Sequence, residues 1–347
     1  MSKHILVIRL SAMGDVAMTV PVLKAFSLQY PEVKITVVSR PFFKPFFDDI
    51  ENVTFFGIDL KERHKGFAGL LRLFSDLRKL NIDAVADLHN VLRSKVVRTL
   101  FDISGKKVAA TDKGRQDKKE LTKLAIKTIS PTKSMFSRHC ETFEKLGFPI
   151  RLENPIFPEK AVLSDEIIAI TGKKEGSWMG IAPFAQYESK VYPIDLMQEV
   201  IDELAKNTSN KIFLFGGGNE EIKMLNQLKN NHKNVLVLAG KTNLKEELAI
   251  ISNLNVMLSM DSGNAHIAAM LGVKVITLWG ATHPFAGFKP FHQPDDFCIT
   301  SDRTQYPFLP TSVYGNKKVE GYENAMRSIL PETVVSKIKE LINYTSP

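Results

Sequence analysis

The chain has 347 residues, which is too long for one ordinary α/β domain and predicts two. Its composition, 44% hydrophobic and 24% charged, excludes a disordered protein. The two cysteines, Cys140 and Cys298, are too few for a disulfide framework, and no Cys/His metal cluster is visible. No secretory signal follows Met1, and no apolar stretch is long enough to span a bilayer, so we expect a cytoplasmic protein.

The net charge of +8 is unevenly distributed along the chain. Residues 1–158 hold 27 basic and 17 acidic residues, a net charge of +10. Residues 159–347 hold 19 basic and 21 acidic residues, a net charge of −2. This asymmetry predicts an anionic partner for the first half, such as a phosphorylated glycolipid, a membrane surface or nucleic acid, and simple solubility explains it equally well. Nucleic acid is the weakest of these, because the basic residues show no interleaved stacking pattern and no known module.

The first half alternates between strand and helix patterns. A continuous apolar run at His4–Leu10 predicts a strand buried on both faces, and a small-residue turn follows it. The next predicted elements, in chain order, are a helix at Val16–Tyr30, a strand at Lys34–Ser39, a helix at Leu70–Leu80, a strand at Ala84–Leu88, a helix at Val91–Phe101 and a short strand at Val108–Ala110. Such alternation is typical of a parallel, doubly wound sheet.

The same pattern restarts after a proline-rich stretch at residues 147–158. Strands are predicted at Trp178–Ala182, Lys211–Phe215, Val235–Leu238, Val256–Met260 and Val275–Trp279, and helices at Leu196–Asn207, Glu220–Asn230, Leu244–Asn253, Ala265–Leu271 and Glu332–Asn343. The prediction is therefore one α/β domain over residues 1–158 and a second over residues 159–330. We expect the final helix, in residues 331–347, to pack back across the first domain. Two such domains would leave a cleft between the carboxyl ends of their sheets, where ligands of open α/β folds bind.

A motif at residues 260–269 gives the strongest chemical signal. Gly263 permits close backbone approach, and the amides of the helix that starts there would attract a diphosphate. Asp261 and Ser262 are positioned either to cap that helix or to bind a ligand. His266 either contacts a phosphate or a sugar hydroxyl, or is simply packed in the core.

Two further signals follow other strands of the second half. Gly217 lies in a triple-glycine turn, and Glu220 or Glu221 just beyond it is positioned to bind ribose hydroxyls. The turn is not a GxGxxG fingerprint, so a dinucleotide oxidoreductase is not indicated; a flexible turn before a helix start is the structural alternative. Lys190, in the loop after Trp178–Ala182, is positioned to neutralise a leaving diphosphate, although most single loop lysines are merely solvated.

Asp15 follows the first strand and lies at a helix start. There it is placed to act as a general base, but the helix dipole favours its carboxylate form and weakens it as a base. A helix-capping role is therefore a strong alternative. All four signals fall at the carboxyl ends of predicted strands, and this shared placement carries more weight than any one of them.

The chain resembles glycosyltransferase family 9, the ADP-heptose:lipopolysaccharide heptosyltransferases. The resemblance rests on the opening segment from Ile5 to Val16, the Asp-Ser-Gly-Asn-Ala-His motif at residues 261–266 and the Leu-Trp-Gly-Ala-Thr-His-Pro segment at residues 278–284. It implies the GT-B fold, two Rossmann-like domains facing a central cleft, with an inverting mechanism and no required metal or other cofactor. The family often has Trp-Pro after the phosphate-binding lysine, and this chain has Tyr192-Pro193 instead.

The resemblance also implies roles for individual residues. Asp15 would activate the acceptor hydroxyl and Lys190 would stabilise the leaving diphosphate. The donor, an ADP-sugar, would be held by Asp261, Ser262, Gly263, His266 and either Glu220 or Glu221, with Gly217 in the adjoining turn. The expected reaction transfers heptose or a similar sugar from ADP-heptose to a lipopolysaccharide-core or related glycolipid.

The acceptor side is less well defined by the sequence. The basic residues Arg40, Arg93, Lys113 and Arg115 are candidates for binding acceptor phosphates or acidic sugars, and the cluster at residues 113–123 fits an exposed loop equally well. Four phenylalanines and two cations at residues 40–47 predict either buried packing or a peripheral contact with the inner face of the inner membrane. The alternative functions are another GT-B enzyme, such as a sugar-nucleotide epimerase, and a non-catalytic nucleotide-sugar binder.

Overall fold

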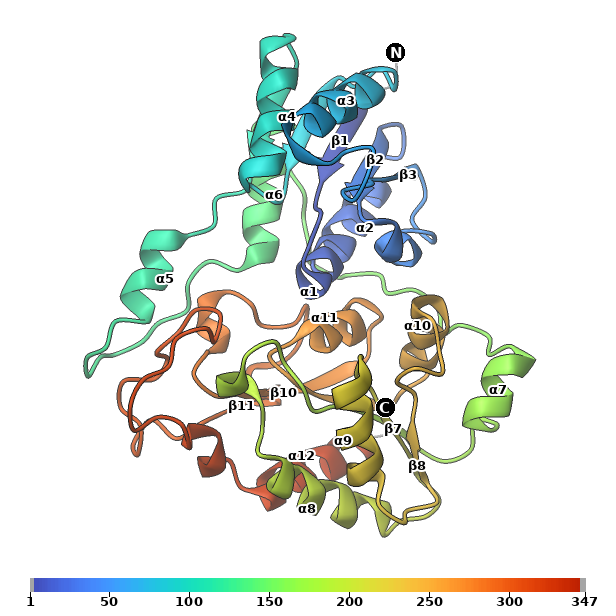
Figure 1. Ribbon diagram of the computed structural model, residues 1–347, viewed down its shortest axis with the longest axis vertical. Helices are drawn as coiled ribbons and strands as arrows, with labels where there is room; N and C mark the ends of the chain where they lie inside the picture. Colours follow the sequence, from blue (N-terminus) through green and yellow to red (C-terminus); the bar gives the residue numbers. More distant parts are fainter. Residues whose placement is uncertain (1–2, 344–347) are drawn as a thin grey trace. The chain divides into compact units, whose positions relative to one another are not determined.

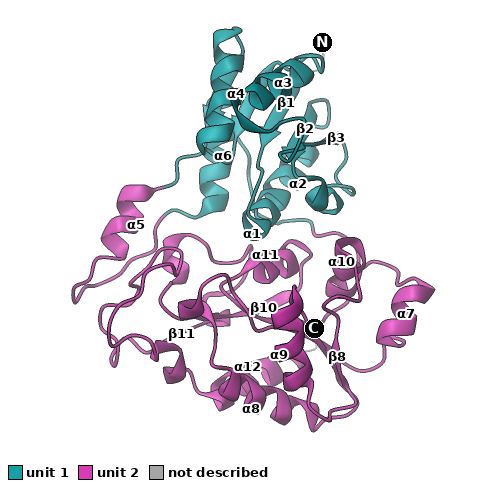
Figure 2. Cartoon of the chain, in the orientation of Figure 1, with its two compact units in different colours: residues 1–113, 133–156 teal, residues 114–132, 157–347 magenta. Residues whose placement is uncertain are grey.

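The chain folds into two compact units, each with its own parallel sheet (Figure 1). The computed structural model describes residues 3–343. Unit 1 comprises residues 1–113 and 133–156, and unit 2 comprises residues 114–132 and 157–347 (Figure 2). Within residues 3–343, no helix combines the length and the apolar character that a bilayer-spanning segment requires.

Unit 1 contains a five-stranded sheet in the order β3-β2-β1-β4-β5. Its strands are β1 (His4–Ile8), β2 (Lys34–Ser39), β3 (Val53–Gly57), β4 (Ala84–Asp87) and β5 (Lys107–Ala110), all paired in parallel. The helices are α1 (Met13–Ala17), α2 (Thr19–Gln29), α3 (Gly66–Arg78), α4 (Leu92–Ile103) and α6 (Met135–Leu146), with a 3₁₀ turn at Pro41–Phe46. A buried apolar cluster from β1, β2 and β4 packs against α3 and α4.

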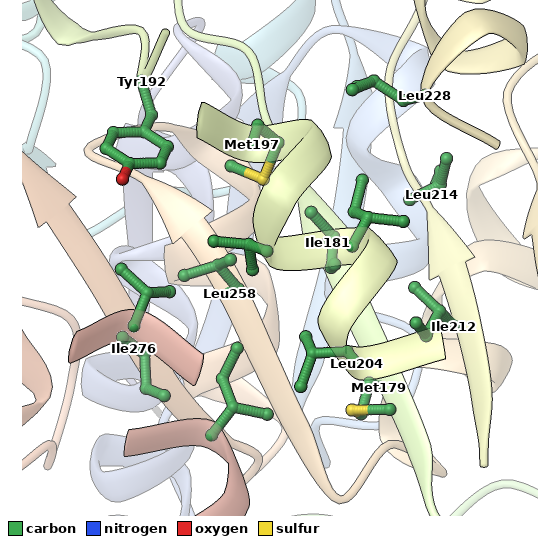
Figure 3. Close-up of a cluster of buried hydrophobic side chains, with 14 of the residues drawn as sticks. Met179, Ile181, Tyr192, Met197, Leu204, Ile212, Leu214, Leu228, Leu258 and Ile276 are labelled. Carbon is green, nitrogen blue, oxygen red and sulfur yellow. The ribbon is translucent and has the colours of Figure 1, made fainter. Parts of the chain in front are cut away.

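Unit 2 contains a six-stranded parallel sheet in the order β11-β10-β9-β6-β7-β8. Its strands are β6 (Trp178–Ala182), β7 (Lys211–Leu214), β8 (Val235–Val237), β9 (Val256–Met260), β10 (Lys274–Trp279) and β11 (Cys298–Thr300). Its helices are α5 (Arg115–Leu121), α7 (Asp165–Thr171), α8 (Ile194–Ala205), α9 (Asn219–Lys229), α10 (Leu244–Ser252), α11 (Gly263–Met270) and α12 (Pro331–Asn343). Figure 3 shows part of the core, where Met179, Ile181, Leu214 and Leu258 of the sheet meet Leu204 of α8.

Among the differences from the sequence-based expectation, three concern where a helix breaks or where a segment packs. The predicted helix Val16–Tyr30 is two helices broken at Met18, because Pro21 has no amide hydrogen to donate to the Ala17 carbonyl. Residues 114–132 pack in unit 2, although the sequence places them within the first domain. Helix α12 packs on α8, β9 and β10 of unit 2 rather than crossing back to the first domain, because its apolar face, including Val334 and Ile338, joins the core of unit 2.

Candidate active site

Asp15 lies in the third position of α1, where the chain leaves the carboxyl end of β1. Its Oδ2 forms an ion pair with Arg9 Nη2 at 2.5 Å, and the Ala12 amide donates to the same oxygen at 3.3 Å. Arg9 is held in place because its Nη1 donates to the Leu88 carbonyl after β4, at 2.7 Å. The Asp15 side chain is 33% exposed, so the carboxylate is fixed by a cation on one side and open to solvent on the other.

His89 lies two residues after β4, on the same carboxyl edge as Asp15. Burial, together with the charges of Arg9 and Lys113, lowers the pKa of His89 to about 3, so its imidazole is neutral at physiological pH. The charges of Asp15 and Arg40 also act on it. His89, to which nothing in the sequence drew attention, therefore lies within electrostatic range of Arg40, Lys113 and Asp15.

The turn that carries His89 is fixed by Asp87, whose side chain is fully buried. Asp87 Oδ1 accepts hydrogen bonds from the amides of His89 and Asn90, at 3.0 and 2.7 Å, and its Oδ2 pairs with Arg98 at 3.1 Å. A buried carboxylate with an arginine and two amides as partners is fully satisfied, so we assign Asp87 a structural role.

The remaining predicted acceptor residues are more scattered. Arg93 is exposed at the start of α4 in unit 1, and Arg115 is exposed at the start of α5 in unit 2. Among the four phenylalanines at residues 42–47, three are buried, with at most 5% of each residue exposed, and only Phe42 is exposed. The structure thus supports the packing interpretation of this segment over membrane contact.

A largely buried polar group in unit 2 joins Lys190, Asp261 and Thr282. Lys190 Nζ donates to Asp261 Oδ2 at 3.1 Å, and Thr282 Oγ1 donates to the same oxygen at 2.9 Å. The side chains of Lys190 and Asp261 are only 12% and 10% exposed. Since these residues follow β6, β9 and β10, the sequence-predicted lysine and aspartate do meet at one edge of the sheet.

Two glycines allow the Lys190 loop to approach the segments beside it. A Cβ atom on Gly280 would lie 2.3 Å from the Ser189 carbonyl oxygen, and one on Gly315 would lie 2.6 Å from Lys190 Cγ. The same contacts carry hydrogen bonds, because the Ala281 amide donates to the Ser189 carbonyl and Ser189 Oγ donates to the Gly315 carbonyl. Neither glycine stood out in the sequence, since each contact joins segments far apart along the chain.

Helix α11 begins at Gly263, directly after Asp261 and Ser262. Ser262 is the N-cap residue, but its side chain makes no capping hydrogen bond and its hydroxyl instead pairs with Ser259 Oγ at 3.1 Å. The first amides of α11 have no intrahelical acceptor, and with the helix dipole they attract anions. His266, one turn into the helix, is 7% exposed. An ammonium group and a helix N-terminus thus flank the same short segment, an arrangement suited to phosphate oxygens.

The two candidate glutamates of α9 differ in their partners. Glu221 Oε2 accepts a hydrogen bond from the Gly217 amide at 2.8 Å, so its carboxylate folds back on the triple-glycine turn. Glu220 is 80% exposed and pairs with Lys223. Of the two, Glu221 is therefore the one held at the carboxyl end of β7.

Glu247 is a further acid that the sequence analysis did not single out. It lies in the first turn of α10, and the Thr242 hydroxyl donates to its Oε1 at 3.4 Å. Burial raises the pKa of Glu247 to about 7. Among residues 3–343 we find no group of three or more His, Cys, Asp or Glu side chains placed to hold a metal ion.

The fold and these two sheet edges define the class of protein. Two Rossmann-like units, each with its own parallel sheet, are the architecture of GT-B glycosyltransferases. The pattern of glycosyltransferase family 9 (heptosyltransferase) matches residues 70–310, and the chain belongs to this family. It is therefore a glycosyltransferase.

Similar proteins cover almost the whole chain. The chain is 25% identical to the lipopolysaccharide core heptosyltransferase OpsX of Haemophilus influenzae, over 98% of this chain and 97% of the relative. It is 26% identical to lipooligosaccharide heptosyltransferase 2 of the same organism, over 98% and 99%.

Solved structures agree on the fold. A glycosyltransferase family 9 protein from Veillonella parvula superposes with a TM-score of 0.75 at 20% identity, covering 98% of this chain and 97% of that one. The E. coli heptosyltransferase WaaC with ADP superposes with a TM-score of 0.68 at 20% identity, covering 97% and 99%.

Proposed function

We propose that the protein transfers heptose, or a similar sugar, from ADP-heptose to a lipopolysaccharide-core or related glycolipid, with inversion at the anomeric carbon. The observation that carries this proposal is the Lys190–Asp261–Thr282 group beside the start of α11. The relatives support the sugar and the class of acceptor, because the proteins with similar sequences are named as heptosyltransferases of lipopolysaccharide and lipooligosaccharide.

Unit 2 is proposed to bind the donor. The Lys190 ammonium and the amides of Gly263 and the residues after it would hold the diphosphate, where negative charge grows as the bond to the sugar breaks. Asp261 orients Lys190 and is itself fixed by Thr282. Ser262 and His266 would complete the contacts to phosphate and sugar. The E. coli protein WaaC, whose fold this chain shares, has been crystallised with ADP and with ADP-2-deoxy-2-fluoro heptose.

Glu221, rather than Glu220, is proposed to bind the ribose or sugar hydroxyls, because its carboxylate is held at the glycine turn after β7. A carboxylate accepts hydrogen bonds from two neighbouring hydroxyls without needing a proton of its own. Since the donor's charge would be met by an ammonium group and backbone amides, we propose that the reaction needs no metal ion.

Unit 1 is proposed to bind the acceptor. Asp15 would take the proton of the acceptor hydroxyl, whose oxygen attacks the anomeric carbon as the bond to the diphosphate breaks and ADP leaves with the bonding electrons. The Arg9 ion pair fixes the orientation of the carboxylate. Arg40 and Lys113 act electrostatically on His89, as Asp15 does, and they would bind phosphates or acidic sugars of the acceptor. Arg93, exposed at the start of α4, is a further candidate. A lipid-linked acceptor would bring the protein to the inner face of the inner membrane.

The test is ADP release from ADP-heptose, measured with and without a lipopolysaccharide-core acceptor. Release of ADP that depends on the acceptor supports sugar transfer. Release that is independent of the acceptor would indicate hydrolysis of the donor instead, and donor binding without ADP release would indicate a non-catalytic role. The second candidate function is epimerisation, because a UDP-N-acetylglucosamine 2-epimerase from Listeria monocytogenes, described as putative, shares the fold at a TM-score of 0.55 and 13% identity. An epimerase would convert the donor sugar with no acceptor present.

A further inference from the structure

Residues 114–132, which we call the α5 segment, leave the sequence of unit 1 and pack in unit 2. The segment starts at Gly114, whose positive φ of 58° precedes α5, and it continues beyond Leu121 as an irregular chain to Thr132. In Figure 2, α5 and the loop after it lie along the outer edge of unit 2. Residues 114–132 therefore lie between two stretches of unit 1 in the sequence but belong to unit 2 in the structure.

Both ends of this segment are anchored by specific contacts. Near its start, Lys118 is 3% exposed and its Nζ lies 4.1 Å from the centre of the Phe288 ring. Near its end, Lys127 Nζ donates to the Phe308 and Pro310 carbonyls, at 2.8 and 3.3 Å. The Lys127 carbonyl in turn accepts from Arg303 Nη2 at 2.7 Å. The part between these anchors is consequently held at a defined place on the surface.

Between the anchors the segment presents two aliphatic side chains to solvent. Leu124 is 55% exposed and Ile126 is 81% exposed. Single exposed aliphatic residues are common on protein surfaces and need no partner. Two exposed aliphatic residues at alternate positions of an anchored loop suggest a binding surface when the same loop also carries an excess of positive charge.

The segment carries that excess charge. It contains five basic and two acidic residues, a net charge of +3, whereas residues 157–347 carry a net charge of −2. Lys118 and Lys127 are used in the anchors, which leaves Arg115, Lys119 and Lys123 exposed in the same segment as Leu124 and Ile126, with Lys123 next to Leu124 in the sequence. A surface that offers both cations and aliphatic groups matches the headgroup region of an anionic bilayer, where phosphates lie directly above acyl chains.

We propose that the α5 segment is the membrane-contacting surface of this protein, with Leu124 and Ile126 inserting between lipid headgroups and Lys119 and Lys123 binding anionic headgroups. The proposed function has the enzyme act on a lipid-linked acceptor, and this proposal names the surface that would contact the membrane. It rests on the proposed function only for the expectation that the enzyme works at a bilayer. The α5 segment thus takes the place of residues 40–47 as the candidate membrane contact, because the phenylalanines of residues 40–47 are mostly buried.

The experiment is flotation of the full-length protein with two kinds of vesicle, pure phosphatidylcholine and phosphatidylcholine mixed with phosphatidylglycerol. We expect binding to the anionic vesicles that weakens as salt is added. The double substitution Leu124→Ser and Ile126→Ser should lower the bound fraction about tenfold or more, because two aliphatic side chains no longer enter the bilayer. Lys119→Glu with Lys123→Glu should remove the preference for anionic vesicles.

The matched control removes two exposed aliphatic side chains elsewhere, Ile156→Ser and Val162→Ser, which are 62% and 94% exposed in the wild-type chain. This control should bind vesicles as the wild type does. An equal loss in the control, unchanged binding of the Leu124/Ile126 variant, or no binding of the wild type to anionic vesicles would each overturn the proposal.

Activity separates this proposal from the proposed function. With a lipid-free core oligosaccharide as acceptor, the Leu124/Ile126 variant should release ADP within about twofold of the wild-type rate, since neither residue belongs to the catalytic or binding groups. An equal fall on soluble and vesicle-bound acceptors would place the segment in catalysis and refute membrane contact. Vesicle binding by a protein that releases no ADP would refute sugar transfer and leave the membrane surface standing.

Discussion

Gly315 offers a sharp test of the assignment of Lys190, because the two residues touch although 125 positions separate them. An alanine Cβ at Gly315 would lie 2.6 Å from Lys190 Cγ, so the lysine must retreat by about 0.8 Å to reach ordinary contact at 3.4 Å. We expect that movement to disrupt the 3.1 Å hydrogen bond between Lys190 Nζ and Asp261 Oδ2, and so to displace the ammonium group. Displacement of a catalytic group by roughly 1 Å costs about 100-fold in rate.

Gly315→Ala also carries a backbone cost, since φ at this position is 84° and a side chain there costs about 1–2 kcal/mol. Gly321→Ala is the matched control, because Gly321 has a φ of 79° and a Cβ there would meet nothing within 4 Å. Both variants should lose stability in thermal melts through this backbone cost, and Gly315→Ala should lose more, because it also disturbs the largely buried Lys190–Asp261 ion pair. Only Gly315→Ala should lose about 10- to 100-fold in acceptor-dependent ADP release. Equal rates in the two variants would refute the role of Lys190 in stabilising the leaving group.

Three other predictions address the acids. Asp15→Asn should lower turnover by about two to four orders of magnitude, with ADP binding by calorimetry unchanged within about twofold; near-normal turnover excludes a general base. Glu221→Gln should weaken ADP-heptose binding about tenfold and Glu220→Gln should not, and the opposite ranking would reverse the assignment. Glu247→Gln should stabilise the protein, because the native state holds a proton between pH 4.5 and about 7 that the unfolded chain releases. The gain, up to about 3 kcal/mol in denaturant melts, should be absent below pH 4.5, grow as pH rises and level off above pH 7, and a gain independent of pH would contradict it.

The sheets of both units were predictable from sequence because their strands are parallel and buried on both faces. Trp178–Ala182 has no polar side chain and Val256–Met260 has only Ser259, and the structure confirms both as strands with the predicted bounds. The strand β3 was missed, since its residues are only half-buried and its Thr54 and Gly57 are exposed. Edge position removes the burial that makes a strand visible in the sequence.

The meeting of Lys190 with Asp261 was predictable for the same reason. Their strands, β6 and β9, are neighbours in a parallel sheet, so loops at the carboxyl ends must lie close together. The contribution of Thr282 follows from the adjacent β10, but nothing in the sequence distinguishes its hydroxyl from that of any other threonine. Gly280 and Gly315 were not predictable, because the reason for each glycine is a contact with a loop far away in the chain.

A segment that leaves one unit and packs in the other is difficult to predict from sequence, as the α5 segment shows. Its composition, five basic residues interrupted by leucine and isoleucine, predicts an exposed loop, and a Pro-rich linker at residues 147–158 marks a domain boundary. Neither signal reveals that residues 114–132 pack on unit 2, because the anchors are a lysine over Phe288 and a lysine on the Phe308 and Pro310 carbonyls. From sequence alone, Lys118 and Lys127 would be predicted to be solvent-exposed, like most lysines. Once the contacts of Lys118 and Lys127 are known, Arg115, Lys119 and Lys123 are the basic residues of the segment that remain exposed, and they are the charges available to an anionic surface.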